Sequence, residues 1–423
     1  MPAARRIGSM TTEMTEALPR IPDDFMQRPY EILEPYRKAG RVHHVVFPHG
    51  ADVWLVTRYA DVRALLQDPR VSKDGTRMNE MFARHTGTYV EDEKPDVGFD
   101  DELSQHMLNS DPPRHTRLRS LVSKAFTLRR MDEFRPRIEQ LVDDYLTKLE
   151  GRDDIDLVTE YAQPLPINLI CDVLGIPFED RERFQQWAVE LVGAGHPPEV
   201  VETASKNVLA YGHQIIAMKR KNPADDMVSA MIEGNPNGDR LTDDELVAMI
   251  FLYTVAGHIT SQHTLSNGIL SLLTNPEAMA RLRSDLSIMP QAIDELMRYD
   301  GGVGVATFRF TAEDIEIGDV VVPKNNILAL SILSAHRDDE QFPNANTLDL
   351  DRRPNGVLGF GHGPHFCIGQ PLAKMQTDIA LTRLIERFPD LRMTADPSFL
   401  EWEPSTLLRG MHHLPASTVP PKS

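Results

Sequence analysis

The sequence predicts a mainly α-helical fold with a small β portion, in one unit that spans residues 1–423. Segments in which apolar side chains recur at helical spacing dominate the chain, whereas strand-like segments are few and short. No internal repeat, low-complexity block or Gly/Ser linker divides it. With 41% hydrophobic and 26% charged residues, the composition is that of an ordinary globular protein. We expect about 1–20 to form a flexible N-terminal segment.

Each element of this prediction has a sequence signal. The segments with helical spacing are 59–66, 111–126, 131–149, 180–192, 242–273, 276–282, 290–299 and 371–387. Residues 51–58 suit a strand, and 315–332 suits a hairpin followed by another strand. Pro and Asn cluster in 342–356, which predicts a long irregular segment of the kind that is ordered around a site.

The helix predicted over 242–273 contains an unusual central stretch, AGHITS, at 256–261. Thr242 and Glu245 form a capping-box pattern at its start, and a proline at 276 ends it. At a length of roughly 45 Å its middle lies in the core. Gly257 costs on the order of 1 kcal/mol against alanine, and the Thr260 hydroxyl can bond the carbonyl of Ala256. Both features favour a local opening of the helix.

Charge and cysteine content exclude several classes of protein. A net charge of -18 argues against nucleic-acid or anionic-membrane binding, which require basic patches. The longest apolar run, 246–257, is too short to span a bilayer, and the N-terminus has no apolar core of a secretion signal, so we expect a cytoplasmic protein. Two cysteines cannot supply a disulfide framework, an iron–sulfur cluster or a four-thiolate zinc site.

One cysteine lies in a segment suited to metal ligation. Around Cys367, residues 358–376 contain glycines at 359, 361, 363 and 369, and a helix is predicted to open at Pro371. Glycines permit close backbone approach to a bulky group, and a helix N-terminus favours a thiolate. Cys171 lies in an apolar run and is predicted to be a buried residue of the hydrophobic core.

The spacing Phe360-Gly361-x-Gly363-x-His365-x-Cys367-x-Gly369 closely resembles the haem-binding signature of the cytochrome P450 family. The resemblance implies a large helical domain plus a β-rich subdomain, with haem b between two central helices. It makes Cys367 the axial ligand of the haem iron, and O2 the co-substrate. Phe360, Gly361 and Gly369 become cofactor-binding residues.

Further family signatures follow in the expected order. His115 and Arg119 lie four apart in a helix and by resemblance bind haem propionates, together with Arg309 and His365. Glu295 and Arg298 match the family's Glu-x-x-Arg, spaced for an ion pair across one helical turn. The family usually has a second arginine that completes a network with this pair, and this chain has Thr347 at that position. Arg352 or Arg353 are the candidates to substitute for it.

By the same resemblance, Ala256, Gly257 and Thr260 are catalytic, and the Thr260 hydroxyl supports oxygen activation and proton relay. The family pattern has an acid where this chain has Ile259, which cannot move a proton. Three interpretations stay open. Water and Thr260 suffice, or the substrate supplies a polar group, or the chemistry is radical coupling or ring closure and not simple hydroxylation.

Electrons should come from separate proteins, because the chain has no flavin or nicotinamide fingerprint. Residues 114–130 carry six Arg and Lys and no acid. This contrast with the net charge predicts a docking face for an acidic ferredoxin, itself reduced from NAD(P)H through a ferredoxin reductase.

The predicted substrate is an apolar small molecule, because two of the segments expected to contact it, 303–306 and 405–408, are short and aliphatic. The other segments expected to contact it are 75–110, roughly 191–211 and the inner face of the helix predicted over 242–273. The candidates are Val303, Val305, Ala306, Thr406, Leu407 and Ile259. Resemblance to actinobacterial tailoring enzymes favours hydroxylation or epoxidation of a polyketide, macrolide or similar secondary metabolite. The alternatives are oxidative coupling, cyclisation or desaturation on the same fold, and a haem-binding protein without turnover.

Overall fold

The computed structural model describes residues 17–86, 88, 101–123, 126–192, 197–235 and 237–420. Residues 1–16 of the expected N-terminal segment lie outside the described residues. From Pro19 onward the backbone runs beside the first strand, since the Val46 amide donates to the Pro19 carbonyl at 2.9 Å.

Helices make up most of the described chain. In the N-terminal half they are α1 (Pro29–Ala39), α2 (Tyr59–Leu65), α3 (Gly75–His85), α4 (Asp101–Ser104), α5 (Arg114–Ser123), α6 (Leu128–Glu133), α7 (Arg135–Leu149), α8 (Pro164–Leu174), α9 (Arg181–Val192) and α10 (Pro198–Lys221). In the C-terminal half they are α11 (Met227–Glu233), α12 (Asp243–Leu273), α13 (Pro276–Ser284), α14 (Met289–Asp300), α15 (Ile332–His336) and α16 (Gln370–Arg387).

The strands are short and join distant parts of the chain. They are β1 (Val42–Val46), β2 (Asp52–Val56), β3 (Val71–Ser72), β4 (Ile155–Asp156), β5 (Arg309–Thr311), β6 (Ile315–Ile317), β7 (Val320–Val322), β8 (Ile327–Leu330), β9 (Arg392–Met393) and β10 (Pro415–Ser417). The largest sheet has the order β1-β2-β8-β5-β3, in which β2 and β8 are parallel. The predicted hairpin is confirmed as β6–β7, with β8 as the strand that follows.

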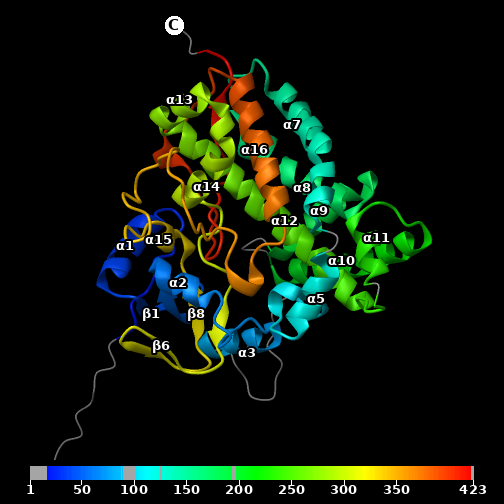
Figure 1. Ribbon diagram of the computed structural model, residues 1–423, viewed down its shortest axis with the longest axis vertical. Helices are drawn as coiled ribbons and strands as arrows, with labels where there is room; N and C mark the ends of the chain where they lie inside the picture. Colours follow the sequence, from blue (N-terminus) through cyan, green and yellow to red (C-terminus); the bar gives the residue numbers. More distant parts are fainter. Residues whose placement is uncertain are drawn as a thin grey trace, which may run out of the picture.

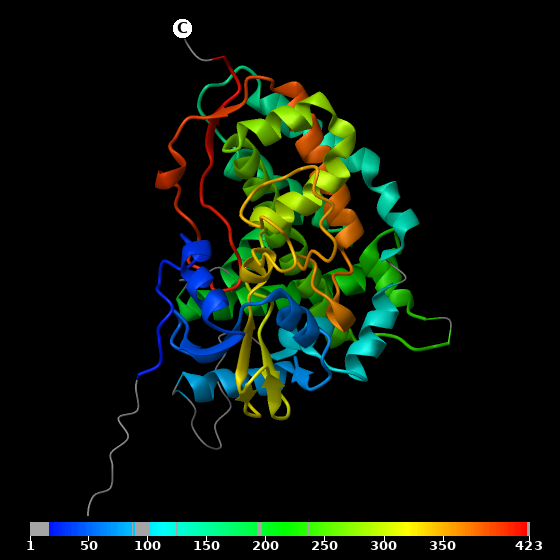
Figure 2. The same ribbon diagram turned by 60° about the vertical axis from the view of Figure 1, so that its left-hand side comes forward.

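Helix α12 crosses the centre of the molecule (Figures 1 and 2). It packs against α8, α10, α14 and α16 and is buried on nearly all sides, as an apolar helix without a polar face must be. Its predicted capping box is confirmed: Thr242 Oγ1 accepts from the Glu245 amide at 3.2 Å, and Glu245 Oε2 accepts from the Thr242 amide at 3.0 Å. Figure 1 places β1, β6 and β8 below this helix, and α7, α13 and α16 above it.

Two helical regions differ from the prediction. The segment 131–149 does not form a single helix: α6 ends at Glu133 and α7 begins at Arg135. Pro136, at the start of α7, explains the break, because its ring clashes with the carbonyl four residues earlier and it has no N–H to donate. Helix α8 was not predicted, because apolar residues fill nearly all of its positions and only Asn168 and Asp172 mark a polar face.

The N-terminal helix α1 and the long helix α10 were also not predicted. Gly212 lies within α10 and faces Val247 of α12, where a Cβ would lie 2.7 Å from Val247 Cγ1. Close packing of two helices therefore requires a glycine that weakens the helical signal of the sequence. None of the helices in the described part of the chain is long and apolar enough to cross a membrane.

Candidate functional site

A cavity of about 280 Å³ lies between α12 and the glycine-rich segment that contains Cys367. Ala256, Gly257 and Thr260 line it from α12, and Cys367 lines it from the opposite segment. The remaining wall comes from α5, α8, α14, α16 and residues 302–309. The structure therefore brings residues from all the predicted signatures, except the Glu295–Arg298 pair, to one cavity.

The α12 side of the cavity is an unbroken helix, so the expected local opening at 256–261 is wrong. Thr260 Oγ1 does donate to the Ala256 carbonyl, at 2.9 Å, as predicted. This bond is compatible with the helical ladder and leaves it intact. Gly257 serves packing, because a Cβ there would lie 2.9 Å from Cδ1 of Ile170 in α8. The glycine lets α8 approach α12 at the cavity wall.

The Cys367 segment is shaped by its glycines. Gly361 and Gly363 have φ of +75° and +72°, in the left-handed region that favours glycine. A Cβ at Gly359 would lie 2.4 Å from Sδ of Met297, so this glycine brings the segment against α14. The Cys367 amide donates to the Phe360 carbonyl at 2.9 Å and closes the loop. The loop geometry presents the thiol at the cavity wall.

The Cys367 thiol lies deep in the protein, yet its side chain is accessible because it borders the cavity. Burial raises the pKa of this thiol, while the backbone N–H groups of Gly369 and Gln370, at the start of α16, act in the opposite direction. A thiol whose protonated form is favoured by burial, but which faces backbone donors, is suited to bind a metal ion that replaces the proton.

The four predicted propionate-binding residues meet at one side of the cavity. The rings of His115 and His365 lie 4.2 Å apart, centroid to centroid, and all four residues line the cavity. Nε2 of His115 is buried and has no hydrogen-bond partner among the described residues. Arg119 donates to the Phe366 carbonyl at 2.6 Å. Burial and the neighbouring cations lower the pKa of His365 to about 2.

Lys73 is an additional cation in this group, and the sequence analysis missed it. It is 3% exposed, and desolvation holds its pKa well below the ordinary value for lysine, with Arg309 acting in the same direction. Nothing in the stretch VSKD at 71–74 distinguishes this lysine from a surface one. Only the path of the chain places it behind the cavity wall.

The residues present fit an iron porphyrin. A thiol suits the iron, the apolar side chains of the cavity suit the macrocycle, and His115, Arg119, Arg309 and His365 suit two carboxylates. The orphaned Nε2 of His115 supports this fit, since a buried polar atom without a partner is rare in a native protein. Among the described residues, no carboxylate lies within 4 Å of Arg309 to neutralise it.

The substrate candidates separate into two groups. Val303 and Ala306 line the cavity. Val305 is fully buried in a different hydrophobic cluster, against which Leu407 packs. Four of the predicted candidates do not line the cavity, namely Val305, Thr406, Leu407 and Ile259. The apolar wall also includes residues that were not predicted, namely Phe126, Leu169 and Met297.

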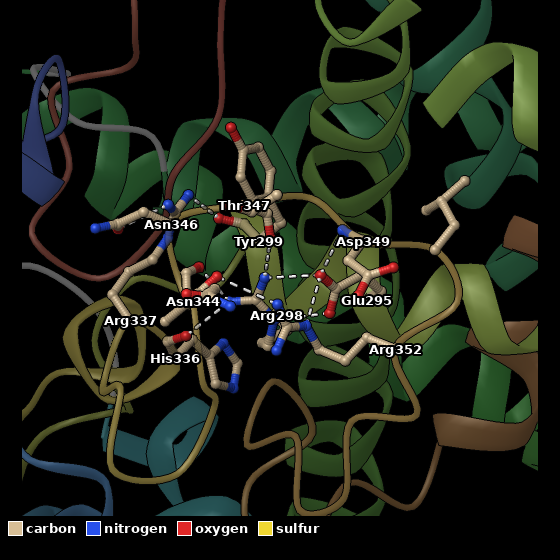
Figure 3. A network of polar contacts seen from close by, with 12 residues as sticks. Glu295, Arg298, Tyr299, His336, Arg337, Asn344, Asn346, Thr347, Asp349 and Arg352 are labelled. Carbon is tan, nitrogen blue, oxygen red and sulfur yellow. Dashed lines mark hydrogen bonds and ion pairs between the residues drawn. The ribbon is translucent and has the colours of Figure 1, made fainter. Parts of the chain in front are cut away.

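A fully buried ion pair lies in α14, at the centre of the polar network shown in Figure 3. Arg298 Nε donates to Glu295 Oε2 at 2.7 Å, and Arg298 Nη2 donates to Oε1 at 2.8 Å, so the predicted pair forms. The remaining guanidinium N–H groups reach backbone carbonyls of the irregular 342–356 segment and of α15. These acceptors are the carbonyls of His336, Ala345 and Thr347. The pair therefore fixes the chain that leads into the Cys367 loop.

Arg352 closes this network. Its Nε donates to Glu295 Oε1 at 3.2 Å, and its Nη1 donates to the Pro343 carbonyl at 2.7 Å. Thr347 contributes its backbone carbonyl to Arg298, and the network has its second arginine at one of the two positions predicted to substitute for the arginine missing at 347. Of the two candidates, Arg352 makes the contact.

The basic stretch 114–130 is more neutralised than its sequence indicates. The ion pairs are Arg117 with Asp239 and Glu245, and Arg130 with Asp225. Arg119 faces the cavity. Arg129 is 89% exposed, and its ion-pair partner among the described residues is Glu133, at 3.9 Å. Lys124 lies outside the described residues.

The comparisons with known proteins agree with this geometry. The family model described as Cytochrome P450 matches residues 199–409. Cytochrome P450 107B1 of Saccharopolyspora erythraea is 46% identical over 87% of this chain and 89% of the relative. Cytochrome P450 monooxygenase PikC of Streptomyces venezuelae is 37% identical over 96% of each chain. The tirandamycin C-bound P450 monooxygenase TamI superimposes with a TM-score of 0.84 at 39% identity, covering 95% of this chain and 100% of that one.

Proposed function

Because the chain belongs to the cytochrome P450 family, we propose that it inserts one oxygen atom from O2 into an apolar secondary metabolite, such as a polyketide or macrolide. The observation that carries this proposal is the largely apolar cavity with Cys367 on one side and Thr260 on the other. The relatives support the substrate class: PikC and TamI are named monooxygenases, and TamI has been solved with tirandamycin C. We place the whole activity in one catalytic domain over 1–423 and expect it in the cytoplasm.

The enzyme uses haem b, O2 and electrons that come from NAD(P)H through partner proteins, as its family does. The haem, when bound, supplies the iron at which oxygen is activated. In this proposal the Cys367 thiolate ligates that iron, and Phe360, Gly361 and Gly369 leave room for the macrocycle. His115, Arg119, Arg309 and His365 pair with its carboxylates. The Glu295–Arg298–Arg352 network holds the segment that carries the thiolate.

Thr260 is proposed to hold and pass protons on the α12 side, and Ala256 and Gly257 to shape the surface around it. Its hydroxyl donates to the Ala256 carbonyl, so its oxygen is free to accept a hydrogen bond from water in the cavity. Ile259 is not a cavity-lining residue and has no proton to give. Proton delivery would therefore depend on Thr260 with water or with a polar group of the substrate.

A separate electron donor is expected to dock on the 114–130 face, with ferredoxin as the candidate. Two of its arginines are already paired, which leaves Arg114 and the highly exposed Arg129 as the cations most available to an acidic partner. If so, ferredoxin-supported turnover falls with rising salt and in Arg129→Glu. Arg28→Glu, immediately before α1, is a control at another exposed arginine. Equal ferredoxin-supported turnover of Arg129→Glu and Arg28→Glu would exclude the 114–130 face as the docking site.

The oxygen-insertion proposal is tested by product analysis with labelled O2, on compounds that shift the haem spin state. Label in the product supports hydroxylation or epoxidation. Substrate consumed without label supports the second candidate, oxidative coupling, cyclisation or desaturation, which the isoleucine at 259 leaves open. A panel of binding compounds without any consumption would indicate a haem protein without turnover.

A further inference from the structure

Lys73 is a buried cation with an unusual set of contacts. It follows β3, its side chain is 3% exposed, and its Nζ donates to Thr307 Oγ1 at 2.5 Å. Asp111 is near, but its carboxylate is used elsewhere: Oδ1 accepts from the Lys73 backbone amide at 2.9 Å, and Oδ2 accepts from the Ser72 hydroxyl. Among the described residues, no carboxylate oxygen lies within 4 Å of Lys73 Nζ.

A second buried cation converges on the same residue. Arg309, 5% exposed, donates from Nη1 to the Thr307 carbonyl at 2.5 Å. Thr307 therefore accepts from Lys73 with its hydroxyl and from Arg309 with its backbone, and it lines the cavity. Desolvation lowers the pKa of Arg309 to about 10, which shows how unfavourable its burial is without an anion.

The positive charge of Lys73 acts on residues that line the cavity. It acts in the direction of a lower pKa on His115, which lines the cavity. Asp111 is the acid that opposes this concentration of positive charge, and it is already hydrogen-bonded to backbone and Ser72. Burying several cations together is costly unless an anion joins them. The arrangement thus calls for an anionic group at the Thr307 side of the cavity.

We propose that Lys73 is a positioning residue of the cofactor site, which favours the cofactor's carboxylates by its charge and through Thr307, beside Arg309. The inference rests on the proposed function, because the anion is taken to be a haem carboxylate. Lys73 then contributes charge to the site from behind Thr307, and haem binding relieves the cost of burying it. A purely structural lysine would instead bond Thr307 and have no interaction with the cofactor's charge.

The test compares Lys73→Met with Lys324→Met, an exposed lysine near the turn between β7 and β8. Haem loss from each holoprotein to an excess of apo-globin is followed spectroscopically. Loss of the Lys73 charge behind Thr307 is expected to accelerate haem loss about tenfold in Lys73→Met. Lys324→Met should match the wild type. Lys73→Gln, which keeps a donor for Thr307 but no charge, should behave like Lys73→Met and serves if the methionine variant folds poorly.

Reconstitution with the dimethyl ester of iron protoporphyrin IX separates charge from packing. With the ester, the difference between Lys73→Met and wild type should shrink to less than about twofold, because the carboxylate charge is gone. An equal acceleration with acid and ester, or no acceleration with either, would overturn the role of Lys73. The spectrum of the reduced wild type with carbon monoxide keeps the two proposals apart: absence of a haem-thiolate band contradicts the proposed function, whereas a normal band with unchanged haem loss contradicts only this inference.

Discussion

Glu295→Gln is expected to destabilise the protein severely without changing its shape. The Glu295 carboxylate accepts four hydrogen bonds, two from Arg298, one from the Asp349 amide and one from Arg352. An amide keeps one oxygen but turns an NH2 toward these donors, and it leaves the Arg298 charge without its counter-ion. Both residues are 0% exposed, so water cannot compensate. Removal of one partner of such a pair costs about 3–5 kcal/mol.

The assay is urea unfolding followed by far-UV circular dichroism, with the slope of the transition compared between variants. Glu34→Gln is the matched control, because Glu34 pairs with Lys38 at 2.6 Å on the exposed face of α1. That change should cost less than about 0.5 kcal/mol. The reasoning would be refuted if Glu295→Gln lost less than about 1 kcal/mol with an unchanged slope, because the buried pair would then contribute no more than a surface pair.

Three further changes test other parts of the structure. Ile259→Glu should raise the fraction of reductant that ends in product over peroxide, and an unchanged ratio would make Ile259 a neutral variant. Gly257→Val should cost about 1–3 kcal/mol by overpacking against Ile170, and adding Ile170→Ala should recover most of it in the same unfolding assay; a cost that persists in the double variant would contradict the packing role. Burial lowers the pKa of His336 from 6.5 to about 3, so the unfolded chain takes up a proton that the folded one does not, and stability should fall by up to about 1.4 kcal/mol per unit as pH drops below about 6.5. In His336→Gln the free energy of unfolding should depend less steeply on pH, by the amount that corresponds to about one proton. Equal slopes for the variant and the wild type would show that another group is responsible for the dependence.

The sequence located the cofactor site because its signals are local. Cys367 and its glycines, the His115–Arg119 pair and Glu295–Arg298 each lie within a few residues of one another, and backbone geometry alone fixes their relation. The capping box at Thr242 was predictable for the same reason. Such motifs need no knowledge of the path of the rest of the chain.

The residues that were missed depend on contacts between distant segments. Lys73 and Thr307 are brought together only by the pairing of β3 with β5. Arg352 could be named only as one of two candidates, because it reaches Glu295 from the far end of an irregular loop whose path no pattern specifies. Gly257 was taken as a helix weakness because its reason, the close approach of Ile170 from α8, is a tertiary contact. Val305 and Leu407, aliphatic like Val303, were assigned to the cavity although they pack in a separate cluster.

The assignment of Cys367 as the iron ligand is tested most directly by the spectrum of the reduced protein with carbon monoxide. The wild type and Cys171→Ala, which alters only a buried core thiol, should both give the red-shifted band of a haem-thiolate protein. Cys367→Ala should lack it while it retains the helical content of the wild type. A red-shifted band that persists in Cys367→Ala, or that is absent from the wild type loaded with haem, would contradict the account.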